Sequence, residues 1–452
     1  MKMILCITGE RWVGMEEDNK KKEWREYARE ITSEVRFKPE VLQGIRVLDV
    51  SVANPSANIT SSLLAELGAE VIKVEPPEGD PLREISPFGE FYFDGTGLDF
   101  LIESRNKKFI TLNLEKEEGR ELFKRMVSRS DVVIESFQPG WMDEKGIGYR
   151  QLREIRPDLI YLAFSAYGHF GPKAEELSKI PDSNLLGLAN SGFMYSTKEL
   201  PEAGEPYNLP TAPGFWMGYY LCALWGVCGV LLSLIHRNRT GEGQMIDVTS
   251  TEAASKITQQ LIWSHAFGEP LEIGVLPLDP AVFSYSFYEI KDGYAFASGY
   301  TDANFKALIT QIEAEHLMEK YPTVFDRIPL EKQRQAYKDV QEAIKKFTFK
   351  ELAERMVKWG EEGKEGVAIY AKVMTSKEVL EDEFWWDKGD FTVYKDRRFS
   401  LLLPTTPWRL SETPFRLKWL GKRVGENNYQ VYKELLGFGR EDLEDLHKNN
   451  II

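Results

Sequence analysis

The first third of the chain alternates short apolar runs with amphipathic runs, and this alternation constrains the fold more than any other feature. The runs expected as strands are residues 44–50, 70–75, 108–112, 131–135 and 159–164, and the runs expected as helices are 61–69, 118–128 and 149–155. Strands that alternate with helices form a parallel sheet covered on both faces. The pattern therefore predicts an α/β fold whose large domain is doubly wound and Rossmann-like.

A dinucleotide site is not indicated by the glycine pattern. The Gly-x-Gly-x-x-Gly fingerprint has to follow a strand directly, and none of the expected strands is followed by one. The nearest pattern, residues 146–148, precedes a helix and follows no strand. A hydride-transferring enzyme is therefore disfavoured.

The remainder of the chain predicts a second domain of α+β type. A hairpin over residues 283–299 with a turn at Asp292-Gly293 is followed by helical patterns and by a strand near 366–370. The expected division is an N-terminal extension with a helix (1–40), the large domain (41–212), a long helix and linker (213–265), the small domain (266–372), and a linker with the return to the large domain (373–452).

Composition narrows the class of protein. The net charge of -14 and the pI near 5.2 disfavour a nucleic-acid surface, which needs clustered basic side chains. Cys6, Cys222 and Cys228 lack the spacing of a disulfide framework or a metal site. We predict a cytoplasmic protein without a metal. The apolar segment 215–235 is nearly long enough to span a membrane, so a membrane-spanning helix is the alternative to a buried core helix at this position.

Several motifs follow one another in a recognisable order. The apolar segment 215–235 leads into His-Arg-Asn-Arg-Thr-Gly-Glu-Gly-Gln at 236–244, and the earlier runs 105–112 and 135–140 read Arg-Asn-Lys-Lys-Phe-Ile-Thr-Leu and Glu-Ser-Phe-Gln-Pro-Gly. With the run from 407 to 414, these motifs resemble the class III CoA-transferase family, which includes formyl-CoA transferase, carnitine CoA-transferase and α-methylacyl-CoA racemase. The resemblance implies a CoA thioester as substrate, no permanently bound cofactor, and a dimer of interlocked chains.

The chain departs from this family at its nucleophile. The family carries an Asp in Gly-Asp-x-x-x-Gly before the long helix, whereas residues 211–219 read Thr-Ala-Pro-Gly-Phe-Trp-Met-Gly-Tyr, and no carboxylate occurs between Glu205 and Glu242. The transferase reaction needs a carboxylate to attack the thioester and hold the acyl group. The chain is therefore expected to lack the usual covalent step.

The resemblance also assigns a CoA site. The residues that match its contacts, or stand in for them, are Asn106, Lys107, Lys108, Leu112, Ser136, Phe137, Lys145 and Lys179. Glu144 stands where the family has Arg, so Lys145 is expected to substitute for it in part, and Glu115 replaces a Lys. A solvated basic turn is the plain alternative for residues 105–108. The substitutions suggest a CoA site that has decayed.

Asp182 is the candidate catalytic residue that remains. The resemblance places it where formyl-CoA transferase has a supporting Glu, and a helix N-cap is the structural alternative. Pro181 precedes it, and none of the five histidines stands at the position that racemase chemistry requires. The segment 266–280 stands where formyl-CoA transferase has a glycine-rich lid, which is not expected here.

The preferred hypothesis is a non-catalytic subunit of a heteromeric class III CoA-transferase, whose homologous partner carries the Asp. The residues 28–37 and the lost nucleophile resemble one subunit of the enzymes that transfer CoA from succinyl-CoA to (R)-benzylsuccinate in anaerobic toluene degradation. One alternative is an active homodimer that uses Asp182 or Glu205. A second alternative is a regulatory protein that binds an acyl-CoA without turnover. No nucleic acid or membrane partner is expected.

Overall fold

The structure, a computed structural model, describes residues 19–33, 37–92, 95–196, 211–258, 286–299, 301–327, 330–397 and 399–452. Its contacts divide the chain into two compact units. The larger unit contains the described residues within Glu17–Thr197, Pro210–Gln259 and Thr405–Ile452, and the smaller unit those within Gln260–Pro404. Of the sequence-based candidates, Cys6, Glu205 and the segment 266–280 lie outside the described residues.

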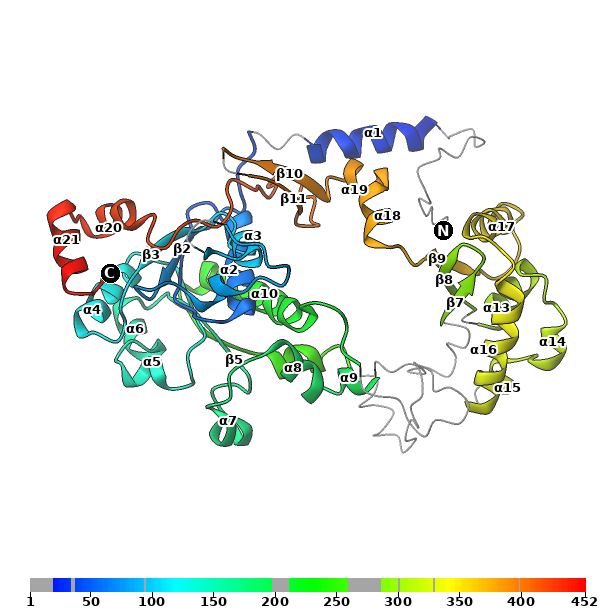
Figure 1. The fold of residues 1–452 in the computed structure, drawn as a ribbon, viewed down its shortest axis with the longest axis horizontal. Coiled ribbons are helices and arrows are strands. Elements are labelled where there is room, and N and C mark those ends of the chain that lie inside the picture. Colours follow the sequence, from blue (N-terminus) through cyan, green and yellow to red (C-terminus); the bar gives the residue numbers. More distant parts are fainter. Residues whose placement is uncertain are drawn as a thin grey trace. The chain divides into compact units, whose positions relative to one another are not determined.

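A six-stranded parallel sheet forms the centre of the larger unit, and the alternation predicts five of its strands (Figure 1). The strands are β1 (Arg46–Asp49), β2 (Glu70–Glu75), β3 (Lys108–Thr111), β4 (Val132–Glu135), β5 (Ile160–Ser165) and β6 (Met245–Thr249), in the order β3-β2-β1-β4-β5-β6. Strands β1 to β5 are buried along almost their whole length because helices cover both faces. The predicted α/β fold class is confirmed.

Two hydrophobic layers enclose this sheet. One face packs against α2 (Pro55–Glu66), α10 (Met217–Thr240) and α11 (Ser250–Ser255), and the other against α4 (Glu117–Val127), α6 (Tyr149–Ile155) and the C-terminal helix α20 (Asn428–Leu436). The last helix, α21 (Arg440–Lys448), has no counterpart in the sequence-based prediction. It contributes the buried Leu446 to the second layer, so the C-terminus completes the core of the larger unit.

Helix α2 begins six residues before the predicted position. Asn54 caps it, because the side-chain oxygen of Asn54 accepts a hydrogen bond of 2.9 Å from the Ala57 amide. Pro55 occupies the first turn, where a missing amide hydrogen costs nothing. The Asn-Pro pair therefore starts the helix directly after the β1 loop.

The long apolar segment forms α10, which packs as a core helix of the larger unit. It is apolar and long enough to cross a membrane, but a Cβ atom on Gly226 would lie 2.6 Å from Phe164 and 2.9 Å from Thr60. The Thr60 hydroxyl also donates a hydrogen bond of 3.1 Å to the Ala223 carbonyl. Such a close approach to α2 and β5 needs a glycine.

Short elements connect the strands of the larger unit. They are the 3-10 helix η1 (Pro81–Glu84) and the helices α3 (Leu98–Ile102), α5 (Trp141–Glu144), α7 (Pro172–Leu177), α8 (Asn184–Asn190) and α9 (Phe193–Ser196). The N-terminal helix α1 (Asn19–Ser33) agrees with the predicted one, and its Trp24 and Tyr27 side chains are exposed.

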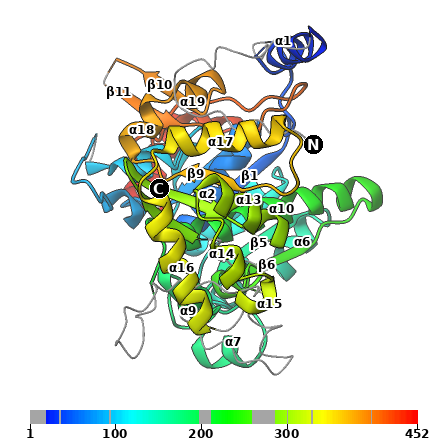
Figure 2. The same ribbon diagram turned by 90° about the vertical axis from the view of Figure 1, so that its right-hand side faces the viewer.

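The smaller unit has a three-stranded antiparallel sheet of β7 (Ser286–Ile290), β8 (Gly293–Ser298) and β9 (Ile369–Lys372). Its helices are α13 (Asp302–Gln311), α14 (Leu317–Lys320), α15 (Val324–Arg327), α16 (Leu330–Ile344) and α17 (Phe349–Glu361) (Figure 2). Residues of α13, α14, α16 and α17 contribute to its core, and α15 contacts α16. The predicted hairpin is present, with Gly293 at a positive φ of 136° after Asp292.

A further segment of the smaller unit has no counterpart in the sequence-based prediction. It consists of α18 (Ser376–Glu381), α19 (Glu383–Asp387) and the antiparallel pair β10 (Phe391–Lys395) and β11 (Ser400–Pro404). Its tryptophans, Trp385 and Trp386, lie against Phe391. The polar turns between these short elements obscure their periodicity, which explains why the sequence pattern does not disclose them.

Candidate functional site

A pocket of about 220 Å³ opens at the carboxyl ends of β1, β4 and β5. The strand order reverses between β1 and β4, and open α/β sheets bind ligands in the crevice at such a switch point. The pocket is lined by Val52, Ala53, Asn54, Ser136, Phe137, Gln138, Pro139, Phe164, Ser165, Ala166, Tyr167, Gly168 and residues 177–182. The pocket therefore lies at the switch point between β1 and β4, where proteins with this kind of sheet usually bind their ligands.

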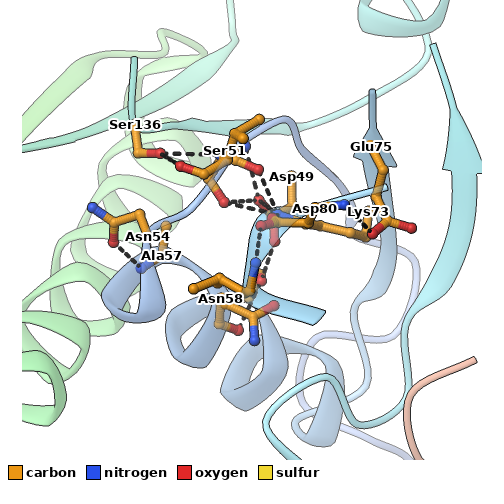
Figure 3. A network of polar contacts seen from close by, with 12 residues as sticks. Asp49, Ser51, Asn54, Ala57, Asn58, Lys73, Glu75, Asp80 and Ser136 are labelled. Carbon is orange, nitrogen blue, oxygen red and sulfur yellow. Dashed lines mark hydrogen bonds and ion pairs between the residues drawn. The ribbon is translucent and has the colours of Figure 1, made fainter. Parts of the chain in front are cut away.

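The loop after β1 forms one wall of the pocket and is held in an unusual conformation. Ala53 has a left-handed φ of 54°, which a residue with a side chain adopts only when its surroundings compensate. The Ala53 amide donates a hydrogen bond of 3.0 Å to Asp80, and the Val52 amide donates one of 3.1 Å to the Ser136 hydroxyl. Asn54, which follows, is thereby fixed at the pocket edge (Figure 3).

A buried network of charged side chains supports this loop from below (Figure 3). Lys73 Nζ lies 3.0 Å from Asp80 Oδ2 and 3.5 Å from Asp49 Oδ1, and it donates a hydrogen bond of 2.5 Å to the Ser51 carbonyl. Burial alone would lower the pKa of Lys73, but Asp49 and Asp80 outweigh it and the pKa is raised. Charges this deep persist only when they are paired.

Lys107 completes the network on the side of α2. Its ammonium group donates hydrogen bonds of 2.7 Å to the Asn58 carbonyl and 2.6 Å to the Asn58 side-chain oxygen, and it lies 3.5 Å from Asp49. Its side chain is fully inaccessible to solvent. Burial lowers the pKa of Lys107 to about 7, although Asp49 opposes the shift. Lys107 therefore serves as a buried donor that ties the start of β3 to α2, and it does not line the pocket.

The second wall of the pocket is the loop after β4. Phe137 stacks on Trp141 with ring centroids 4.3 Å apart and planes 17° apart. Lys145 Nζ lies 5.4 Å from the centroid of the Trp141 ring, and it also pairs with Glu115. The pairing means that Lys145 offsets the negative charge of Glu115.

Asp182 is the carboxylate that lines the pocket. Both its oxygens are buried, and among the described residues neither accepts a hydrogen bond of normal geometry. Burial raises the pKa of Asp182 to about 6, and the nearby Ser250, Ser183 amide and Asn54 offset that rise only in part. A carboxyl group in a pocket whose pKa is raised toward neutral pH is typical of a functional position.

The N-cap alternative for Asp182 is wrong. Ser183 caps α8, because its hydroxyl oxygen accepts a hydrogen bond of 3.2 Å from the Leu186 amide. Asp182 stands one residue too early to reach that turn, and its carboxylate is directed to the buried side. Ser183, and not Asp182, is therefore the N-cap residue of α8.

Helix α10 begins beside Asp182 and presents no carboxylate there. The side-chain oxygen of Asn184 accepts hydrogen bonds of 2.9 Å from the Gly218 amide and 3.3 Å from the Tyr219 amide. Burial raises the pKa of the Tyr219 phenol, the contact with Asn184 opposes that rise, and the charge of the nearby Asp182 adds to it. An aromatic alcohol therefore lies at the start of α10, and the sequence has no carboxylate from residue 206 to residue 241.

The structure brings four of the predicted site residues together at the pocket: Ser136, Phe137, Lys179 and Asp182. The remaining five lie elsewhere in the larger unit. Asn106 bonds to the chain near Arg416 and Lys418, Lys108 pairs with Glu70 and Glu434, Lys145 pairs with Glu115, and Lys107 and Leu112 are buried. The alternative of a solvated basic turn is wrong for residues 105–107, because Arg105 and Lys107 are buried.

Two functional candidates escaped the sequence-based prediction. Asn54 lies at the pocket and close to Asp182, and the Asn-Pro start of α2 is the signal that could have identified it. His169 lies directly behind the pocket loop 166–168, where it bridges two carboxylates. The local sequence Gly168-His169-Phe170-Gly171 gives no such signal, because the partners of His169 come from β4 and β6.

The arrangement can bind a polar group and hold a carboxyl group out of water. Lys179 is exposed, and among the described residues it makes no hydrogen bond or ion pair, so its charge is available to an anion such as a phosphate. No group of His, Cys, Asp and Glu suited to a metal occurs in the described ranges. The pocket can therefore bind an anion at Lys179, close to the desolvated carboxyl group of Asp182.

Comparison with known proteins identifies the class. A model of CoA-transferase family III matches residues 42–428. The chain belongs to CoA-transferase family III.

Three relatives from Chloroflexus aurantiacus span nearly the whole chain. The alpha subunit of succinyl-CoA--L-malate CoA-transferase is 32% identical, over 91% of this chain and 92% of that protein. The beta subunit of the same enzyme is 31% identical, over 91% and 98%. Succinyl-CoA--D-citramalate CoA-transferase is 30% identical, over 92% and 98%. The chain is thus similar to both kinds of subunit of one enzyme.

Among solved structures, a CAIB/BAIF family protein from Brucella suis has a similar fold. It superposes with a TM-score of 0.71 at 26% sequence identity, and the match covers 88% of this chain and all of that one. The two-unit α/β architecture is therefore that of the family.

Proposed function

We propose that this chain is the subunit of a heteromeric family III CoA-transferase that does not itself carry the acyl group. The observation that carries the proposal is the start of α10, where Tyr219 lies near Asp182 and no carboxylate occurs from residue 206 to residue 241. A homologous partner chain would supply the aspartate. The enzyme would move CoA from a donor such as succinyl-CoA to a carboxylic acid acceptor such as (R)-benzylsuccinate in anaerobic aromatic degradation, in the cytoplasm.

The chemistry explains why Tyr219 does not replace the missing Asp. A carboxylate attacks the thioester carbonyl, CoA leaves as thiolate, and the resulting mixed anhydride is reactive enough to be opened by CoA thiolate. Burial and the Asp182 charge raise the pKa of Tyr219, so its phenol stays protonated at neutral pH. A protonated phenol is a poor nucleophile. The start of α10 therefore offers no nucleophile for the attack on the thioester carbonyl.

Two further observations support the assignment of substrate and partner. The relatives named above include the alpha and beta subunits of one succinyl-CoA-dependent enzyme, which makes a homologous partner and a succinyl-CoA donor reasonable for this chain. Trp216 and Tyr219 make an edge-to-face contact at the start of α10, with ring centroids 6.1 Å apart. Aromatic side chains there suit an aryl acceptor.

The test is to isolate the chain from its native host under conditions that keep complexes intact. Mass spectrometry of the stoichiometric companions is expected to find a second family III chain that carries the Gly-Asp-x-x-x-Gly aspartate. The co-expressed pair is expected to transfer CoA from succinyl-CoA, whereas this chain alone is expected to be inactive. A homodimer with full transferase activity would overturn the proposal.

A second candidate function is an active homodimer in which Asp182 is the nucleophile. The observation that favours it is the buried carboxylate, free of hydrogen bonds of normal geometry among the described residues, in the pocket. Its raised pKa of about 6 still leaves Asp182 mostly ionised at pH 7. Asp182 could then attack a thioester in the same way as the family aspartate.

Trapping the intermediate separates the two candidates. The purified chain is incubated with succinyl-CoA and analysed by intact-protein mass spectrometry for a covalent CoA adduct, with Asp182→Asn and, as a matched control, the exposed Glu176→Gln. No adduct on any of the three proteins supports the non-catalytic subunit. An adduct on the wild type and on Glu176→Gln that is absent from Asp182→Asn would establish the homodimer instead.

A further inference from the structure

Three residues on neighbouring strands form a row across the sheet behind the pocket. Glu135 of β4 pairs in register with Ala163 of β5, and Ala163 pairs in register with Asp247 of β6. Residues in register on parallel strands project from the same face, so the two carboxylates flank a methyl group. The small side chain in the middle leaves room for another group between the carboxylates.

The imidazole of His169 fills that space. His169 Nδ1 lies 3.0 Å from Asp247 Oδ1, and Nε2 lies 3.5 Å from Glu135 Oε1. Both ring nitrogens therefore face carboxylate oxygens, an arrangement that suits the doubly protonated ring. The imidazolium would link the two outer members of the row.

Each carboxylate also holds a loop that lines the pocket. The second oxygen of Glu135 accepts a hydrogen bond of 2.7 Å from the Phe137 amide, in the loop after β4. The second oxygen of Asp247 accepts one of 2.9 Å from the His169 amide, in the loop after β5. Phe137 and Gly168 line the pocket, so the bridge fixes two of its walls relative to each other.

We infer that His169 is a positioning residue whose charged imidazole holds the loops after β4 and β5 in the geometry that receives a CoA thioester. The identity of that ligand rests on the proposed function. The role of the bridge rests on the row of Glu135, Ala163 and Asp247 and on the two amides that the carboxylates hold.

The charges around the imidazole favour its protonated form. Burial would lower the pKa of His169, but hydrogen bonds with Asp247 and Glu135 outweigh it and raise the pKa to about 9. Burial raises the pKa of Glu135, although His169, the Phe137 amide and the Tyr161 hydroxyl oppose that rise. The pKa of Tyr161 is itself raised, by burial, by Glu135 and by Asp143, so its phenol stays neutral.

The sign of the pH effect follows from this shift. The pKa of His169 is higher in the folded chain than the usual value of 6.5, so the bridge contributes fully below pH 6.5 and is lost as pH rises through about 9. A neutral imidazole keeps one donor and can satisfy one carboxylate only. The two loops would then move independently.

The first measurement is the pKa of His169 itself. Because the chain has five histidines, the imidazole resonances of protein labelled at the histidine Cε1 can be assigned with His169→Gln and followed through a pH titration. A midpoint near 9 in the wild type, which moves toward 6.5 in Asp247→Asn, is the expected result. A wild-type midpoint near 6.5 would overturn the inference.

The second measurement is ligand affinity as a function of pH. S-Ethyl-CoA, a thioether without a free thiol or a hydrolysable thioester, is titrated calorimetrically into the native complex. The wild type is expected to lose about tenfold in affinity as His169 titrates, whereas His169→Gln is weak by a similar factor at neutral pH and insensitive to pH over the same range. His236→Gln, at the exposed end of α10, is the control and should match the wild type.

Each outcome separates the inference from the proposed function. If His169→Gln binds as the wild type does at every pH, the positioning role is wrong. If no variant binds S-ethyl-CoA at any pH, the ligand assignment fails, and amide hydrogen exchange then decides the role of the bridge. Faster exchange in loops 136–140 and 166–171 of His169→Gln supports the bridge, and unchanged exchange overturns it.

Discussion

Lys73 Nζ lies 3.0 Å from Asp80 Oδ2 in the interior of the larger unit, and neither side chain is accessible to solvent. Replacement by Lys73→Met leaves Asp80 and Asp49 buried without their shared cation. We expect a loss of about 3–5 kcal/mol in the free energy of unfolding. Chemical denaturation of Lys73→Met against Lys124→Met, which breaks a partly exposed pair with Glu121, measures it. A loss within about 1 kcal/mol, as expected for the control, would contradict this prediction.

Asp182 is expected to destabilise the chain at neutral pH. Its pKa is raised from 3.8 to about 6 in the folded state, so the folded state holds the proton more tightly and stability falls as pH rises between these values. Asp182→Asn should therefore raise the free energy of unfolding at pH 7 by up to about 3 kcal/mol. The gain should fade as pH falls through 6 and vanish near 4. If the stability gain of Asp182→Asn instead grew toward low pH, this prediction would be wrong.

Lys179 is expected to contribute charge to the binding of a CoA phosphate. It is exposed at the pocket rim, so Lys179→Ala should weaken S-ethyl-CoA binding to the native complex about tenfold, or ~1.4 kcal/mol. The difference should shrink as salt is added, because screening weakens exposed charges. Calorimetry at two salt concentrations, with Lys124→Ala on the distant helix α4 as control, measures this. A salt-independent difference would point to lost packing instead.

Gly226 is expected to be intolerant of any side chain. A Cβ atom there would lie 2.6 Å from Phe164 and 2.9 Å from Thr60, so Gly226→Ala must push α10 away from α2 and β5. We expect a loss of about 1–3 kcal/mol in the free energy of unfolding. Gly214→Ala, where a Cβ atom meets nothing within 4 Å, is the matched control. Equal stability of the two variants would contradict the core packing of α10.

The positions of the strands could be predicted because each is a short apolar run between helical patterns. The predicted run 70–75 coincides with β2, and the predicted helix 149–155 coincides with α6. The start of α2 was predicted too late, because residues 55–60 read Pro-Ser-Ala-Asn-Ile-Thr, which lacks amphipathic spacing although all six are buried. Periodicity therefore missed this part of the helix, whereas the Asn-Pro pair at 54–55 marks its start.

The candidate site was predicted only in part, because it is assembled from several strands. Asp182, Lys179, Ser136 and Phe137 were identified from their motifs, and they meet at one pocket. Lys107 belongs to the same motif as Asn106, but its side chain turns under α2 to Asn58 and Asp49. Sequence spacing does not distinguish a lysine that faces a ligand from one that faces a buried carboxylate.

The sequence by itself determined the class of fold, the family, and the absence of a carboxylate at the start of α10, since each depends on local periodicity or residue identity. Tertiary structure alone decided which polar groups share a site. The row of Glu135, Ala163 and Asp247 exists because strands far apart in sequence lie in register, and it is this register that gives His169 its two partners. Contacts of this kind follow from strand order and burial, which no local pattern encodes.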